Sequence, residues 1–194
     1  MTNTELLLRT LRQKTEVPDE EFAAYLNDTE VRQFKKGEVI IRERAVQRFN
    51  IFITKGCIRT YDIGEDGIEK TIYFAEEGYW TGDLESLRYQ KPATHNFQAL
   101  EDTEAITLPA DKWEDAYNKY KWIRDMHALG LQRWATKLSE HIGRIISDTP
   151  EANYLRLQKE RPTLVKRVPL YYIASYLGIS PETLSRIRKK ISGQ

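Results

Sequence analysis

The segment 168–191 constrains the fold of this chain most strongly, because its residues predict two short helices joined by a tight turn. Gly178 lies at the turn, where a glycine can adopt a positive φ without a Cβ clash. Ser180 is a good N-cap, and Pro181 then occupies the first helical position, where its missing N–H is harmless. Two helices are therefore expected, over 170–176 and 181–190.

Apolar residues at helical spacing give these two helices a small shared core, formed by Ile173, Ala174, Leu177, Leu184 and Ile187. One helix that packs and a second that offers polar and cationic side chains is the helix-turn-helix pattern of proteins that read the DNA major groove. A plain two-helix hairpin at the end of a globular domain is the alternative. The candidate DNA contacts are Ser180, Glu182, Thr183, Ser185, Arg186, Arg188, Lys189 and Lys190.

Charge is distributed unevenly along the chain. The whole sequence carries a net charge of only +1. Residues 151–194 contain nine Lys/Arg and three Asp/Glu, a net charge of +6, whereas the remainder carries −5. A basic C-terminal segment on an acidic body points to a polyanionic partner at that end, and a solvated basic surface is the alternative.

Residue usage excludes several other classes of protein. The single cysteine, Cys57, excludes an intrachain disulfide framework and cysteine-rich zinc or iron–sulfur sites. His127 and His141 lack the spacing of a metal-binding pair, and no catalytic cluster is evident, so we expect neither a metal site nor an enzyme. No apolar run approaches the roughly 20 residues of a membrane span, and no signal peptide is recognisable. We therefore expect a cytoplasmic protein without membrane contact.

Short apolar or alternating runs predict a strand-rich region between residues 31 and 108. Glycine-containing turns separate these runs at Gly37, Gly56, 64–67 and Gly78. Many short strands at near-regular spacing favour an antiparallel β-barrel or roll. The expected strands are 38–41, 49–54, 57–63, 70–74, 95–99 and 104–108.

Helical patterns flank this region, over 4–27 before it and over 111–117 and 120–146 after it. Apolar side chains recur along the long helix at three- and four-residue steps, which predicts a coiled-coil-like seam with a second copy of the chain. Packing within the monomer is the alternative. The predicted stripe comprises Ile123, Met126, Leu129, Gly130, Trp134, Leu138, His141, Ile142 and Ile145.

These elements define an α+β chain in three parts. N-terminal helices and an antiparallel β-roll are expected over 1–118, a long dimerisation helix over 119–148, and a small helical helix-turn-helix domain over 149–194. Thr149 and Pro150 mark a hinge before the last part.

The order of these parts resembles the Crp/Fnr family of bacterial transcription regulators over nearly the whole chain. Four segments carry the local resemblance, 34–41, 56–61, 98–105 and 171–188, and the last is the most specific. The resemblance implies a double-stranded β-helix like that of cyclic-nucleotide-binding proteins. It also implies a homodimer that binds double-stranded DNA and has RNA polymerase as a further partner.

In this family the roll commonly binds a cyclic nucleotide through a Gly-Glu pair and an Arg about ten residues later. By this resemblance Gly82 and Asp83 fall at the Gly-Glu position, and Ala93 falls where the Arg is expected. Loss of that cation costs a charge-assisted hydrogen bond of roughly 1.5–3 kcal/mol, on the order of ten- to a hundredfold in affinity. We therefore expect a small-molecule effector other than ordinary cyclic AMP, or none, although Arg88 or Lys91 could substitute. The candidate effector contacts are Gly82, Asp83, Leu84, Ser86, Ala93 and Thr94.

The second helix of the helix-turn-helix departs from the family's Arg-Glu-Thr-x-x-Arg pattern, because Pro181 replaces the first Arg. Glu182 can accept from a cytosine amino group, and Arg186 can donate to guanine or phosphate, so a different target sequence is expected. Few residues follow this helix, and we expect no β-hairpin wing. A ligand-binding or protein-interaction module with weakened DNA binding is the alternative function.

Overall fold

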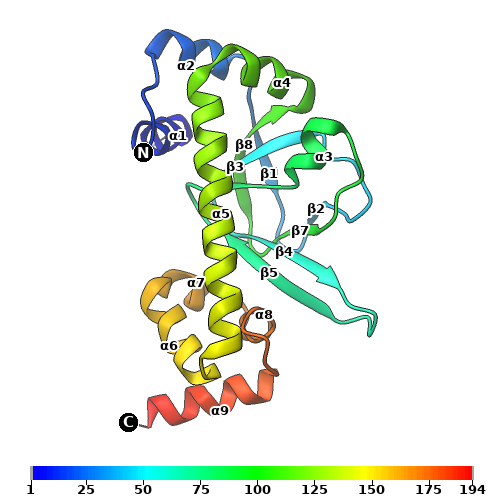
Figure 1. Ribbon diagram of the computed structural model, residues 1–194, viewed down its shortest axis with the longest axis vertical. Coiled ribbons are helices and arrows are strands. Elements are labelled where there is room, and N and C mark those ends of the chain that lie inside the picture. Colours follow the sequence, from blue (N-terminus) through cyan, green and yellow to red (C-terminus); the bar gives the residue numbers. More distant parts are fainter. Residues whose placement is uncertain (1, 194) are drawn as a thin grey trace. The chain divides into compact units, whose positions relative to one another are not determined.

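The computed structural model describes residues 2–193 (Figure 1). The chain forms two compact units. The first comprises Met1–Thr60 and Phe74–Gln132, and the second comprises Tyr61–Tyr73 and Arg133–Gln194. This division passes through the long helix, and the predicted boundaries at 118/119 and 148/149 stay a prediction.

The helices and strands have the following bounds. The helices are α1 (Asn3–Arg12), α2 (Asp19–Leu26), α3 (Leu84–Tyr89), α4 (Ala110–Lys119), α5 (Lys121–Ser147), α6 (Pro150–Glu160), α7 (Pro162–Arg167), α8 (Leu170–Tyr176) and α9 (Pro181–Ser192). The strands are β1 (Glu30–Phe34), β2 (Val39–Ile41), β3 (Phe49–Lys55), β4 (Ile58–Ile63), β5 (Glu69–Ala75), β6 (Trp80–Thr81), β7 (Asn96–Ala99) and β8 (Thr103–Pro109).

The strands form two four-stranded sheets, in the orders β1-β8-β3-β6 and β2-β7-β4-β5. The pairs β1–β8, β3–β8, β3–β6 and β2–β7 are all antiparallel. Figure 1 shows β4 and β5 as the two arms of one hairpin. The predicted α+β class with an antiparallel β-roll is confirmed.

The core of the first unit joins the N-terminal helices to the roll. A capping box between Thr2 and Glu5 starts α1, whose Leu7 and Leu11 are fully buried. Phe52 of β3 belongs to the same apolar cluster. The first turns of α5 complete it with Trp122, Ile123 and Met126.

The second unit packs α6 to α9 around buried apolar side chains, Tyr154, Leu157, Leu164, Ile173, Ala174, Leu177 and Leu184. The ring of His141 on α5 stacks on Tyr176 of α8, with centroids 4.1 Å apart. The predicted shared core of the helix-turn-helix is therefore present, although Ile187 is only half-buried.

One local expectation was wrong. His95 was expected on a strand but lies in a bend, and β7 begins at Asn96. The cause is Thr94, whose backbone and hydroxyl are bonded to a side chain eleven residues earlier. At the expected hinge, α5 ends at Ser147, the Thr149 side chain caps α6 and Pro150 is the first residue of α6; the hinge itself stays a prediction.

None of the described helices combines the length and the apolarity that crossing a bilayer requires.

Candidate nucleic-acid interface and effector site

The turn between α8 and α9 ends the first helix with two characteristic backbone hydrogen bonds. Gly178 has a φ of 68°. Its N–H donates to the carbonyl of Ser175, and the N–H of Ile179 donates to that of Ala174, each at 3.0 Å. This is a Schellman motif, in which the residue after the helix must be left-handed. A Cβ built on Gly178 would have Ile145 at 3.9 Å, so the positive φ rather than crowding favours glycine here.

Ser180 starts α9 as predicted. Its Oγ accepts the backbone N–H of Thr183 at 3.2 Å, and Thr183 Oγ1 in turn accepts from the Arg186 guanidinium at 3.2 Å. The pKa of the exposed Glu182 lies below its usual value, because its own backbone N–H and the Ser180 hydroxyl hydrogen-bond to the carboxylate. The N-terminal turn of α9 is therefore a preorganised polar surface.

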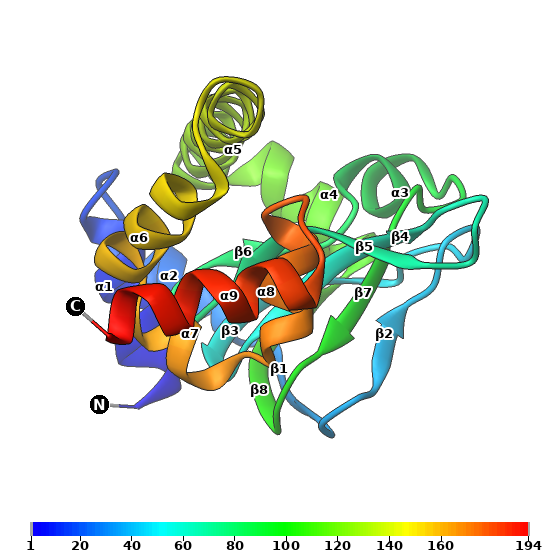
Figure 2. The same ribbon diagram turned by 90° about the horizontal axis from the view of Figure 1, so that it is seen from below.

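One face of α9 carries four exposed polar side chains. Glu182, Ser185, Arg186 and Lys189 have the spacing i, i+3, i+4 and i+7, which places them on one side of a helix. Leu184 is fully buried on the opposite side. Figure 2 shows α9 as an uninterrupted helix that follows α8 after a short turn.

The other predicted DNA contacts lie at the edges of this face. Helical geometry places Arg188 on one flank and Lys190 on the other. Lys190 forms an ion pair with Glu151 of α6, with 2.6 Å between Nζ and Oε2. Within residues 2–193, Arg188 and Lys189 form no ion pair. The structure thus assembles four candidates on one face and holds Lys190 against α6.

An exposed apolar stripe runs along α5. Leu131, Trp134, Ile142 and Ile145 are 47%, 49%, 49% and 40% exposed, respectively. With the half-buried Leu138 between them, the steps are three, four, four and three residues. This average of 3.5 residues is the repeat of a left-handed coiled coil, and an exposed apolar stripe marks an interaction surface.

The candidate effector contacts lie in two segments, 82–86 and 93–94, which together are called the effector cassette. A buried glutamine closes this cassette. Gln47 is 2% exposed, its Nε2 donates to the Phe49 carbonyl at 2.8 Å, and its Oε1 accepts the Asp83 N–H at 2.6 Å. Gly82 has a φ of 125°, and a Cβ there would lie 2.5 Å from Gln47 Nε2. Gln47 therefore fills the space beside Gly82.

The Asp83 carboxylate caps α3 and reaches across to the segment before β7. Its Oδ1 accepts the Ser86 N–H at 2.9 Å, and its Oδ2 accepts from Thr94. Burial acts to raise the pKa of Asp83. The hydrogen bonds from Thr94 and Ser86, together with the charge of His95, outweigh burial and hold that pKa below its usual value.

Arg88, one of the two cationic residues that could replace the missing Arg, is directed elsewhere. Ala93, at the expected position, is 2% exposed. Arg88 forms an ion pair with Glu114 of α4 at 3.3 Å and lies 4.3 Å from the centre of the Tyr117 ring. The hydrogen bond from Glu114 raises the pKa of Arg88 despite partial burial. The guanidinium of Arg88 is therefore bound to α4, and its substitution for the missing Arg stays an untested prediction.

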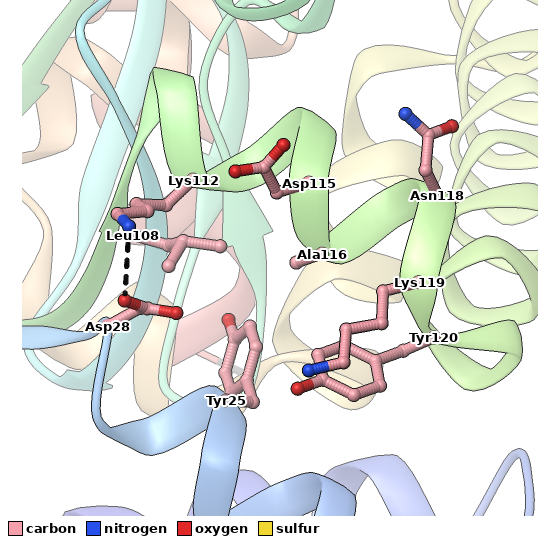
Figure 3. A pocket seen from close by; sticks show the side chains of 9 residues that line it. All are labelled: Tyr25, Asp28, Leu108, Lys112, Asp115, Ala116, Asn118, Lys119 and Tyr120. Carbon is pink, nitrogen blue, oxygen red and sulfur yellow. Dashed lines mark ion pairs between the residues drawn. The ribbon is translucent and has the colours of Figure 1, made fainter.

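A separate pocket of about 590 Å³ lies against α4 (Figure 3). Tyr25 lines it, with a pKa raised by complete burial, and the Asp28–Lys112 ion pair spans 3.6 Å. The sequence did not indicate this pocket, and it contains none of the candidate site residues. Its remaining lining residues are Leu108, Asp115, Ala116, Asn118, Lys119 and Tyr120.

Two residues with long-range contacts were missed from the sequence. Gln47 stands thirty-six positions before Asp83 in the printed sequence, so no local motif connects them. Ser175 of α8 bonds to β5 within the second unit, through Thr71 and Glu69. A serine on an expected helix gives no signal for such a contact.

Residues 31–120 match the family model described as the cyclic nucleotide-binding domain. The chain is similar to the solved structure of FixK2 from Bradyrhizobium japonicum, with 17% identity, TM-score 0.72, and coverage of 86% of this chain and 85% of that chain. It is also similar to the c-di-GMP responsive global regulator CLP of Xanthomonas campestris, with 12% identity, TM-score 0.72, and coverage of 91% and 92%. A Crp/Fnr-family transcriptional regulator from Eubacterium rectale has 15% identity, TM-score 0.69, and coverage of 91% and 84%.

At these identities the likeness shows the fold, and the predicted resemblance to Crp/Fnr regulators is confirmed at that level. No curated protein matches the chain in sequence.

Proposed function

We propose that this chain is a homodimeric, sequence-specific DNA-binding transcription regulator of the Crp/Fnr type, acting in the cytoplasm. The observation that carries the proposal is the exposed face of α9, where Glu182, Ser185, Arg186 and Lys189 stand opposite a buried leucine. A helix with this polarity, following a Schellman turn and a capping serine, has the geometry of a recognition helix.

Each candidate has a distinct role in this proposal. Arg186 donates to guanine or to a phosphate, and Glu182 accepts from a cytosine amino group. Ser180 and Thr183, at the helix N-terminus, and Ser185 contact the phosphate backbone. Arg188, Lys189 and Lys190 add sequence-independent attraction to phosphates.

The apolar stripe of α5 supports the homodimer. Leu131, Trp134 and Ile142 are each about half exposed in the monomer. Burying apolar surface stabilises association by about 25 cal/mol per Å². A second copy of α5 supplies a matching stripe, and such a dimer sets two recognition helices ~34–36 Å apart, one turn of DNA.

The roll supports a sensory or structural part of the regulator. The segment matching the cyclic nucleotide-binding domain covers the roll, but Ala93 has no cationic group for a phosphate. We therefore also propose that the effector, if there is one, is not ordinary cyclic AMP. RNA polymerase is the proposed partner through which DNA-bound dimers change transcription, and transcription in vitro from a promoter carrying the selected site tests it.

Selection from a random-sequence DNA pool tests the function itself. We expect enrichment of a palindromic site whose half-sites are about 10 base pairs apart. The logarithm of the binding constant for this site should fall linearly with the logarithm of the salt concentration. No enriched site, or binding that is indifferent to salt, would contradict the proposal.

A ligand-binding or protein-interaction module is the second candidate. Pro181 cannot hydrogen-bond to a base, and Lys190 is paired with Glu151, which favours weakened DNA contacts. If Arg186→Ala leaves DNA binding unchanged while a metabolite raises the melting temperature, this candidate replaces the first.

A further inference from the structure

Three hydrogen-bond donors in the cassette converge on the carboxylate of Asp83. The Ser86 N–H donates to Oδ1 at 2.9 Å. The Thr94 N–H and hydroxyl both donate to Oδ2, at 2.8 and 2.7 Å. These donors belong to two separate segments, the first turn of α3 and the bend before β7, so one carboxylate ties the two segments together.

Two further N–H groups of the cassette are also engaged. The N–H of Asp83 donates to Gln47 Oε1 at 2.6 Å, and the N–H of Ala93 donates to the Ala45 carbonyl at 2.8 Å. An anionic ligand is held by such backbone donors and by cations. Here four backbone N–H groups already have partners within the chain.

The charges of the cassette, like its hydrogen bonds, disfavour the binding of a phosphate. A phosphate that approached Thr94 would meet the carboxylate of Asp83, which has the same sign, and the buried methyl group of Ala93. Arg88 is held by Glu114. Four backbone N–H groups of the cassette and the Arg88 guanidinium are therefore already engaged within the chain, and the Asp83 carboxylate repels a second anion.

We propose that the Asp83 carboxylate is the cassette's own anion. It takes the donors that the phosphate of an effector would need, so the roll keeps its closed form without a cyclic nucleotide. If the chain is the proposed regulator, it should bind DNA constitutively, that is, without a cyclic nucleotide; this consequence rests on the proposed function. The hydrogen bonds between Thr94 and the Asp83 carboxylate, called the latch below, do not depend on the proposed function.

Amide hydrogen exchange of the full chain tests the latch. Asp83→Asn keeps the shape of the side chain but leaves one carbonyl oxygen where two carboxylate oxygens accept. We expect exchange at the Ser86 and Thr94 amides to accelerate at least tenfold. The matched control is Glu85→Gln, the same change on the next-but-one residue, which is exposed on α3 and should leave both amides protected. Equal exchange in the two variants would overturn the latch.

Thr94→Val provides a milder variant in case Asp83→Asn does not fold. It removes the hydroxyl that donates to Asp83 and keeps the backbone N–H, so the melting temperature should fall below that of the wild type. An unchanged melting temperature relative to wild type would count against the latch.

Ligand addition tests the consequence. Millimolar cyclic AMP or cyclic GMP should leave the melting temperature of the wild type unchanged and its DNA affinity within about twofold. A rise in melting temperature with either nucleotide would overturn the proposal. Failure of the regulator function would appear instead as absence of DNA binding in every variant, with the exchange results intact.

Discussion

The hydroxyl oxygen of Ser175 accepts the backbone N–H of Thr71 at 2.8 Å, which joins α8 to the strand β5. The same hydroxyl lies 3.2 Å from the Glu69 carbonyl, to which it donates. β5 is the edge strand of its sheet, and an edge strand presents unpaired backbone groups. Ser175 thus pairs with two of these groups as a neighbouring strand would.

Ser175→Ala should loosen this attachment. Loss of a hydrogen bond to a buried backbone group costs about 1 kcal/mol, which is roughly 2–4 °C in the melting temperature of a chain of this size. Exchange at the Thr71 amide should accelerate. Ser185→Ala, on the exposed face of α9, should change neither quantity, and unaltered Thr71 exchange in Ser175→Ala would show that the contact is absent in solution.

Charge placed in the α5 stripe should dissociate the dimer. Ile142→Glu puts a carboxylate into the proposed seam, where burial of an unpaired charge is costly. Sedimentation or light scattering should then report a monomer. Thr136→Glu, on the opposite side of α5, should leave the dimer intact. A monomeric wild type would contradict the seam.

The pH dependence of stability should reflect His141. Burial lowers its pKa, and the charge of Arg144 adds to this against a hydrogen bond with the Tyr176 backbone. The unfolded chain binds this proton near pH 6.5, before the folded chain does. Stability is therefore full above about pH 6.5 and falls as the pH drops below it.

His141→Gln should flatten part of this decline in melting temperature between about pH 7 and pH 5. Ser139→Gln, an exposed position on the same helix, should keep the full decline. His127, whose pKa is also lowered by burial and by Arg88, contributes in the same direction. An identical pH profile in His141→Gln and wild type would refute the assignment.

Two glycine substitutions should change the stability of the folded chain in opposite directions. Gly178→Ala places a Cβ at a φ of 68°, which costs about 1–2 kcal/mol. Gly143→Ala lies in α5 with nothing within 4 Å of the added Cβ, so it should stabilise the chain by about 0.5–1 kcal/mol. Thermal unfolding measures both, and a stabilising Gly178→Ala would contradict the left-handed turn.

The helix-turn-helix was predictable because its signals are local. Gly178, Ser180 and Pro181 fix the turn and the start of α9, and the expected helix over 170–176 coincides with α8. The long helix was likewise placed to within one residue at each end. Its two ends differ in burial, however, and the periodic pattern alone did not reveal this.

Short elements and long-range contacts were not predictable. β1 has only one buried residue, Phe34, so no alternating pattern marks it. β6 has two residues, and α3 has six with a single buried apolar side chain, Leu87. The closure of the cassette depends on Gln47, far away in the sequence, and therefore required the structure.

The central claim is that α9 binds DNA through its exposed face, and the salt dependence of binding by matched variants tests it most directly. On the selected site, Arg186→Ala should weaken binding by about 1–3 kcal/mol, roughly 5- to 150-fold. Lys189→Ala should reduce the slope of log K against log salt by about 0.9. Lys159→Ala, an exposed lysine on α6, should change neither. Equal affinity and equal salt dependence in the wild type and all three variants would contradict DNA binding by this face of α9.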